Sequence, residues 1–247
     1  MNRIALSLTA VVALSGAALA QSPAEKVLAR YVAATGGAAA YAKVKTQVAT
    51  GTISLPAQGV SGKFTMSFKA PNKMVLSTSL PGIGQIGQGY DGKMGWSKDP
   101  FSGTQTLEGE ELAQIVNELT LTNDPAGWKK VFSKIELLSP GKVGKIKALR
   151  LKLTPKKGAA QMLFFDEKSG LLLRRDAVVV TKQGSMASES YYSDYRNVEG
   201  VKMAFKIRVV AGPAEQVMLL TDVKNNGALA DEIFAKPKAA PAGKSKL

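Results

Sequence analysis

The sequence contains no cysteine and no histidine. Without these residues, Ser-His-Asp and Cys-His catalysis, thiolate chemistry and nearly every kind of protein zinc site are excluded. The missing cysteine also excludes disulfide bonds, so hydrophobic packing must stabilise the fold even in an oxidising compartment. We therefore predict a protein that is not an enzyme and that has no cofactor and no metal site.

A pair of carboxylates is the remaining route to catalysis. Asp99, Glu108, Glu110 and Glu111 lie close together in the sequence, and two acids that face each other in a cleft can serve a glycosidase. However, Glu110 and Glu111 also suit the first turn of a helix, where the helix dipole favours negative charge. We favour this structural interpretation and keep the enzyme as a minor alternative.

Long apolar runs are absent after the first twenty residues, and none approaches the roughly 20 residues that span a bilayer. Residues 1–20 combine Arg3, an apolar stretch over 4–14 and an A-x-A motif that ends at Ala20. This pattern is typical of an export signal that is cleaved after Ala20. No later cysteine can accept a lipid anchor, so the sequence predicts an exported, soluble periplasmic protein.

Basic residues outnumber acidic ones by 33 to 19, which gives a formal net charge of +14. Four lysines fall within 236–247, an Ala/Pro/Gly/Lys-rich stretch that we predict to be a disordered basic tail. Such a protein can touch anionic membrane surfaces transiently or bind an acidic partner. Solubility and a solvated sheet face explain the charge equally well. Because the lysines are spread along the predicted strands, we expect no nucleic-acid partner.

Two distant segments, 60–70 and 201–209, alternate apolar and polar residues almost without interruption. In the first, Phe64, Met66 and Phe68 share one side and Lys63 and Lys69 the other. Period-two alternation is typical of a strand with one buried and one solvated face. Two such strands far apart in one chain predict a large antiparallel sheet that is apolar on one side only.

The remaining elements follow from turn and capping signals. Ser22, Pro23 and Glu25 form a capping box that begins a helix, and a short second helix is predicted over 38–44. A further helix is predicted over 109–119, followed by a short one after Asp124. Strands are predicted in two series, over 47–97 and 134–223, with Asp91-Gly92 as a two-residue hairpin turn. We predict a signal over 1–20 and one domain over 21–235, mainly β with a few helices, an α+β fold with about eleven strands.

The segment 82–87 matches the pattern G-x-G-x-x-G. A dinucleotide site needs a strand before this motif and a helix after it. Here a hairpin is predicted to follow, so we interpret Gly82, Gly84 and Gly87 as glycines of a strongly bent strand.

Several short segments resemble a known superfamily. They are 31–37 (YVAATGG), 70–73 (APNK), 87–92 (GQGYDG), 96–103 (WSKDPFSG), 107–112 (LEGEEL) and 193–200 (SDYRNVEG). Together with the order of the elements, they resemble the LolA/LolB-type lipoprotein carriers and proteins described as outer-membrane lipoprotein-sorting proteins.

This resemblance implies an incomplete antiparallel β-barrel with a helical lid over an apolar cavity. The candidates for the lipid-binding wall are apolar residues of the predicted strands: Phe64, Met66, Phe68, Met74, Leu76, Ile86, Trp96, Met203, Phe205 and Ile207. The candidates for the lid lie in the central helical segments: Leu112, Ile115, Val116 and Trp128.

The favoured hypothesis is a periplasmic carrier that binds the acyl chains of a lipid or lipoprotein and transfers them between envelope membranes during outer-membrane biogenesis. Envelope donor and acceptor proteins would be its partners. At about 0.8 kcal/mol per CH₂, a dozen buried methylenes face roughly 10 kcal/mol on entering water, so a carrier needs an apolar cavity. A non-catalytic binding or scaffold module of a cell-envelope complex, with a filled core, is the alternative. An outer-membrane barrel is the third; the internal helices and the many strand lysines argue against it.

Overall fold

The computed structural model describes residues 21–182 and 184–238. The predicted export signal over 1–20 lies outside these residues, as does the predicted tail beyond residue 238. Within the described part of the chain, no helix is long and apolar enough to cross a membrane.

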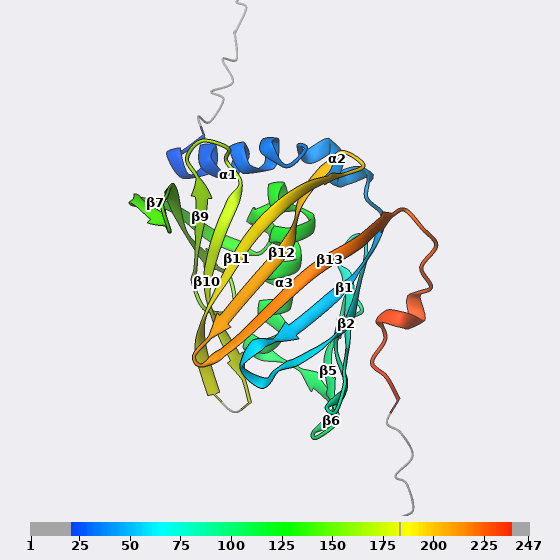
Figure 1. The fold of residues 1–247 in the computed structure, drawn as a ribbon. Helices are drawn as coiled ribbons and strands as arrows, with labels where there is room; N and C mark the ends of the chain where they lie inside the picture. The colour runs from blue at the N-terminus through cyan, green and yellow to red at the C-terminus, as the bar shows by residue number, and fades with distance from the viewer. Residues whose placement is uncertain (1–20, 183, 239–247) are drawn as a thin grey trace, which may run out of the picture.

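The core of the fold is one antiparallel sheet of thirteen strands (Figure 1). Its spatial order is β6-β5-β4-β3-β2-β1-β13-β12-β11-β10-β9-β8-β7. β6 and β7 are the two edges, so the sheet curls without closing. The strands are β1 (Thr46–Leu55), β2 (Val60–Lys69), β3 (Lys73–Leu80), β4 (Gly84–Tyr90), β5 (Gly95–Asp99), β6 (Gly103–Leu107), β7 (Phe132–Val143), β8 (Ile146–Pro155), β9 (Gln161–Asp166), β10 (Leu172–Thr181), β11 (Gly184–Val198), β12 (Val201–Ala211) and β13 (Ala214–Asn225).

The prediction of a mainly-β, incomplete antiparallel barrel is confirmed, with thirteen strands in place of about eleven. One strand that the sequence did not predict is β6, because it is only five residues long, mostly polar and directly follows a turn. The predicted two-residue turn at Asp91-Gly92 is wrong. The strands end at Tyr90 and resume at Gly95, and the Asp91 carboxylate accepts hydrogen bonds from the backbone N–H groups of Lys93 and Met94.

Helices occupy one end and one face of the sheet. The α-helices are α1 (Pro23–Ala34), α2 (Ala38–Lys43) and α3 (Gly109–Asn123), and the 3₁₀ turns are η1 (Pro56–Gln58), η2 (Pro125–Lys130) and η3 (Asp231–Phe234). The predicted capping box at Ser22 and Glu25 is present. In Figure 1, α1 and α2 lie across one end of the sheet, and we call this the α1 end.

Strand register defines which residues share a face. Phe64, Met66 and Phe68 of β2 lie opposite Gly51, Ala49 and Gln47 of β1 and share one face. We call this the inner face, because α3 packs on its Phe68 region and α1 packs on its β7–β9 region. Alternation then places the charged residues of β2 on the outer face.

The connection that carries α3 joins the two sheet edges. The chain leaves β6 at one edge, forms α3 and η2, and enters β7 at the other edge. Since both ends of this connection are fixed to opposite edges, α3 must cross the opening of the sheet. Glu110 and Glu111 lie in its first turn, as predicted.

The last described residues turn back onto the outer face. We call residues 226–238 the C-terminal strap. Phe234 of η3 is fully buried, and the Nε1 of Trp96 donates a hydrogen bond of 2.8 Å to its carbonyl oxygen. Asp231 forms ion pairs with Lys69 and Lys73 at 2.7 and 2.9 Å.

Candidate functional site

The candidate site begins with β2 and β3, whose apolar residues lie opposite one another on the inner face. Met66 pairs with Leu76, and Phe68 pairs with Met74. Phe64, one alternation further along β2, is almost completely buried. The period-two pattern in the sequence is therefore the physical cause of a continuous apolar stripe across the two strands.

β12 and β13 extend this stripe on the other side of β1. Ile207 lies opposite Met218, so its neighbours Met203 and Phe205 at alternate positions share the face. One hydrophobic cluster joins both halves, which we call the central wall. Its buried members are Ala49, Ile53, Phe64, Leu80, Phe205, Met218 and Leu220.

The central wall differs from the two flanking clusters in what packs on it. The flanking clusters each contain buried helical residues, Leu28 of α1 in one and Ile115 of α3 in the other. Among the described residues, every buried member of the central wall comes from a strand. Met66, Leu76, Met203 and Ile207 pack beside it and keep part of their surface exposed. The central wall is therefore an apolar surface that stays partly exposed at these four residues and to which, among the described residues, no helix contributes a buried side chain.

α3 occupies the neighbouring part of the inner face. Ile115 is buried against Phe68 and Tyr90, and Leu112 and Val116 pack on the same cluster. Met74 also packs here. The structure thus brings together three predicted lid residues and two predicted wall residues.

Polar contacts attach α3 to β10 on its other side. The side-chain amide of Gln114 accepts a hydrogen bond from the N–H of Val180 at 3.2 Å and donates to its carbonyl oxygen at 3.3 Å. The guanidinium of Arg175, from the inner face of β10, lies 3.2 Å from the carboxylate of Glu118. Asn117 donates a further hydrogen bond to the carbonyl oxygen of Lys157.

Arg175 is the least solvated charge among these contacts, with only 15% of its side chain exposed. Burial acts to lower the pKa of this guanidinium, but the carboxylate of Glu118 leaves it raised above its ordinary value. Within the described residues, its Nε has no hydrogen-bond partner. Glu118 is therefore the group that compensates a nearly buried positive charge at the junction of α3 and the sheet.

Two predicted site residues lie elsewhere. Trp96 pairs with Gly89, and the register from β2 to β5 places both on the outer face. A Cβ on Gly89 would meet the Trp96 ring at 2.5 Å, so the indole lies directly over this glycine and holds the C-terminal strap. Trp128 of η2 packs on the core beneath α1 rather than over the central wall. The predictions for Trp96 and Trp128 were wrong for the same reason. A single aromatic residue outside an alternating pattern cannot be assigned to one face of a sheet from the sequence.

Ile86 lies on the inner face, opposite Thr78 of β3. It is near the end of β4 and remains exposed, away from the central wall. In the G-x-G-x-x-G segment, Gly82 and Gly84 adopt positive φ values of 77° and 112° around the β3–β4 turn. The segment leads into β4 and not into a helix, as predicted.

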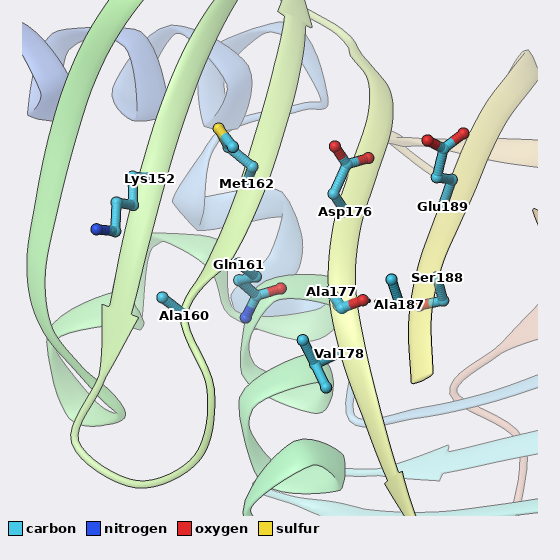
Figure 2. A pocket seen from close by; sticks show the side chains of 10 residues that line it. All are labelled: Lys152, Ala160, Gln161, Met162, Asp176, Ala177, Val178, Ala187, Ser188 and Glu189. Atoms are coloured by element: carbon cyan, nitrogen blue, oxygen red, sulfur yellow. Dashed lines mark hydrogen bonds between the residues drawn. The ribbon is translucent and has the colours of Figure 1, made fainter. Parts of the chain in front are cut away.

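A pocket of about 340 Å³ lies where β9 and β10 separate (Figure 2). The carboxylates of Asp176 and Glu189 project on one side of it and Lys152 lies on the other. Arg174 binds both carboxylates at 2.5 Å, and the hydrogen bond with Asp176 raises the pKa of Arg174. The two acids are therefore engaged with one guanidinium and are not a free pair for acid–base chemistry.

The acids considered from the sequence also have structural roles. Asp99 accepts hydrogen bonds from the Ser102 hydroxyl and from the backbone N–H groups of Ser102 and Phe101, and these bonds, first that of the hydroxyl, lower the pKa of Asp99. Asp166 makes the corresponding contacts with Lys168 and Ser169. No group of three or more acidic side chains in the described part of the chain is arranged to hold a metal ion.

Sequence comparison finds no family model that matches the chain. No curated protein matches it either. Solved structures do match. A LolA superfamily protein from Nitrosomonas europaea aligns with a TM-score of 0.57 at 15% identity, over 87% of this chain and 99% of that one. The chain has a LolA/LolB-like fold.

Two further structures agree with this fold. A DUF1329 family protein from Desulfovibrio piger gives a TM-score of 0.57 at 15% identity, over 87% of this chain and 98% of that one. A putative outer membrane lipoprotein-sorting protein domain from Vibrio parahaemolyticus gives 0.53 at 11% identity, over 85% and 94%. The resemblance predicted from short segments is therefore confirmed for the fold.

The sequence did not predict the contacts of Gln114, Glu118 and Arg175, which attach α3 to β10. Each is a polar residue within an otherwise ordinary amphipathic segment, and the partners are about 60 residues apart in the chain. For the C-terminal strap the sequence offered one indication. Phe234 is a large apolar residue close to a stretch rich in alanine, proline and lysine, which favours a buried contact at this position.

Proposed function

We propose that this protein is an exported carrier that binds the acyl chains of a lipid or lipoprotein on its central wall. The observation that supports the proposal most directly is the partly exposed apolar surface formed by Met66, Leu76, Met203 and Ile207. These side chains belong to one cluster whose buried members come from five sheet strands, and two are methionines, whose flexible thioethers adapt to varied apolar partners. An acyl chain bound there would remove its own apolar surface and that of the central wall from water.

In this proposal, α3 is the lid. It packs on the inner face beside the central wall, and its attachment to β10 depends on a small number of polar contacts from Gln114, Asn117 and Glu118. Polar contacts of this kind can be exchanged for water at moderate cost. Movement of α3 away from β10 would enlarge the apolar surface available to an acyl chain without disrupting the sheet.

The experiment is saturable uptake of a fluorescent fatty acid, together with lipid extraction and mass spectrometry of the protein purified from its native envelope. We expect one or a few bound acyl lipids and saturable uptake. The variant Met66→Asp, which places a charge on the central wall, should reduce uptake at least tenfold, since a carboxylate disfavours an apolar ligand strongly. The matched control Thr65→Asp carries the same charge on the outer face of the same strand and should take up fatty acid normally.

The second candidate is a non-catalytic binding or scaffold module of a cell-envelope complex with a filled core. The almost complete burial of Phe64 and Phe205 by the protein itself favours it, because a filled core needs no ligand. Absence of bound lipid and of saturable uptake in the wild-type protein would support this candidate and reject the carrier. Lipid transfer between membranes, with its donor and acceptor proteins, requires that uptake be found first.

A further inference from the structure

The hairpin turns at the end of the sheet opposite the α1 end carry apolar side chains in water. Phe101, at the tip of the β5–β6 hairpin, is 87% exposed, and Met186 of β11 is 48% exposed. Val179 of β10 and Ile86 of β4 are 39% and 37% exposed. We call Ile86, Phe101, Val179 and Met186 the apolar rim. Single exposed apolar residues are common on proteins, but four from three hairpins at one end call for an explanation.

The exposure of Phe101 does not come from a loosely held loop. The carboxylate of Asp99 accepts hydrogen bonds of 2.8 Å from the backbone N–H groups of both Phe101 and Ser102. The Ser102 hydroxyl hydrogen-bonds to the same carboxylate. These three contacts fix the turn, so the aromatic ring projects into solvent from a defined backbone.

Side-chain contacts join the rim hairpins to one another. Gln105 of β6 donates to the carbonyl oxygen of Ser102 at 2.8 Å, and its own carbonyl oxygen accepts from Lys182, beside the β10–β11 turn, at 3.2 Å. On the other side, Gly84 at the start of β4 lies so close to Pro100 that an added Cβ would be 2.9 Å from the proline ring. The rim is therefore one connected surface and not three separate tips.

The two apolar residues of the β10–β11 hairpin form a cross-strand pair. Val179 lies opposite Met186, and alternation from Arg175 places this pair on the inner face. The pair thus continues the inner face to the edge of the molecule. If the rim touches a surface, an apolar molecule that moves from that surface to the central wall would pass Val179 and Met186 first.

The charged side chains at these hairpins are mainly basic. Lys98 and Lys182 are both exposed next to the rim, and the carboxylate of Asp99 is engaged with the turn. The whole chain carries a formal net charge of +14. An exposed aromatic flanked by lysines is complementary to an interface of anionic headgroups over acyl chains.

We propose that the apolar rim docks on anionic lipid bilayers, with Phe101 inserted at the level of the headgroups and with Lys98 and Lys182 close to the lipid phosphates. The biological purpose rests on the proposed carrier function, since docking by this end would place the inner face next to the membrane that holds the cargo. The docking itself depends only on the rim. Its measurement does not require that the protein carry any lipid.

The test is flotation of the purified chain with vesicles of phosphatidylglycerol and phosphatidylcholine, against vesicles of phosphatidylcholine alone. We expect binding to the anionic vesicles that falls with added salt. Phe101→Ser should lower the partition coefficient about tenfold, which is the size expected for one large apolar side chain. The double variant Lys98→Gln/Lys182→Gln should lower the partition coefficient on anionic vesicles about 25-fold relative to wild type, at roughly fivefold per lysine.

The matched control is Ile146→Ser. Ile146 is 46% exposed at the β7–β8 turn, and the hydrogen bond between Lys147 and Glu167 places this turn beside the β9–β10 turn at the α1 end. Its removal should leave flotation unchanged. Equal flotation of Phe101→Ser and wild type, an equal loss in Ile146→Ser, or no flotation of the wild type would each overturn the proposal.

Fatty-acid uptake by the same variants separates this inference from the carrier proposal. Phe101→Ser should take up fatty acid from solution as the wild type does, because Phe101 is not part of the central wall. Normal uptake with unchanged flotation rejects the rim alone. Normal flotation without uptake in any variant rejects the carrier alone.

Discussion

Phe64 is the residue on which the packing of the central wall depends most. It is almost fully buried, and its ring reaches across Gly51, where an added Cβ would lie 2.8 Å from it. We expect Phe64→Ala to lower the free energy of unfolding by about 3–5 kcal/mol, because it removes a large buried side chain and leaves a cavity. Urea unfolding monitored by circular dichroism measures the loss.

The control for Phe64 is Phe101→Ala, which removes the same side chain from an exposed position. Its effect on the free energy of unfolding should be within about 0.5 kcal/mol. A loss below about 1 kcal/mol in Phe64→Ala would mean that the wall can collapse onto the vacated space, and the wall would then be too deformable to hold a defined site.

Trp96 lies on the outer face, where it contacts the C-terminal strap. In Trp96→Phe the aromatic contact over Gly89 is largely kept, but the hydrogen bond from Nε1 to the carbonyl oxygen of Phe234 is lost. We expect a loss of about 1 kcal/mol in unfolding free energy, faster amide exchange in the C-terminal strap and unchanged fatty-acid uptake. Trp128→Phe is the control for the loss of an indole ring. A clear fall in uptake by Trp96→Phe would contradict the outer-face assignment.

At the scale of elements, α1 contains Glu25, an acid whose pKa is strongly lowered in the folded protein. The pKa of Glu25 falls from 4.5 to about 2, first because Lys129 hydrogen-bonds to its carboxylate and also because of the backbone N–H of Ser22. The folded-state pKa is depressed, so this stabilisation is complete above the unfolded-state pKa. It is lost as the pH falls from about 4.5 towards 2.

The measurement for Glu25 is the melting temperature as a function of pH. Between about pH 4.5 and 2, the melting temperature of the wild type should fall more steeply than that of Glu25→Gln, which cannot titrate at this position. Above pH 5 the variant should be the less stable of the two, because it lacks the ion pair with Lys129. Parallel pH profiles for the two proteins would contradict the coupling.

The attachment of α3 to β10 gives the second prediction at this scale. Glu118→Gln leaves the guanidinium of Arg175 nearly buried without its carboxylate, which should weaken the contact and speed amide exchange across 109–123. Arg175→Met should be close to neutral, since it replaces the buried charge with an apolar chain of similar length. Glu110→Gln, on the exposed first turn of the same helix, is the control. Equal exchange in all three would show that the ion pair does not hold the helix.

At the scale of the whole molecule, the absence of cysteine allows a direct test of the lid. A Cβ on Gly158 would lie 3.7 Å from the Cβ of Ala113, which matches the separation in a disulfide. We expect the oxidised double variant Ala113→Cys/Gly158→Cys, with α3 tied to the β8–β9 loop, to lose most fatty-acid uptake. Reduction should restore it.

The reduced form of this double variant is its own control. Gly158 has a φ of +92°, so cysteine there strains the backbone and lowers stability in both redox forms. Because the strain is present in both forms, it does not affect the difference in uptake between oxidised and reduced protein. Equal uptake before and after reduction would mean that α3 does not move during binding, and the wall would then be filled by direct access alone.

Much of the architecture could be predicted from the sequence, because its signals are local. The alternation in β2 and β12 and the capping box at Ser22 act over a few residues, and the structure shows each of them. The same alternation identified most of the wall, including Phe64 and Phe205. It failed for β6, which is too short and polar to show a period, and for Trp96 and Trp128, whose faces depend on register and on the path of the chain.

The sequence by itself therefore determined the class of the fold and which residues of each strand point the same way, since side-chain direction along a strand follows from backbone geometry alone. It also excluded histidine and cysteine chemistry. Only the tertiary structure decided what packs on each face: α1 and α3 on parts of the inner face and the strap on the outer face, while the buried members of the central wall among the described residues all come from strands. These contacts join residues far apart in the chain, such as Arg175 and Glu118. Their free energy depends on distances that no local pattern encodes.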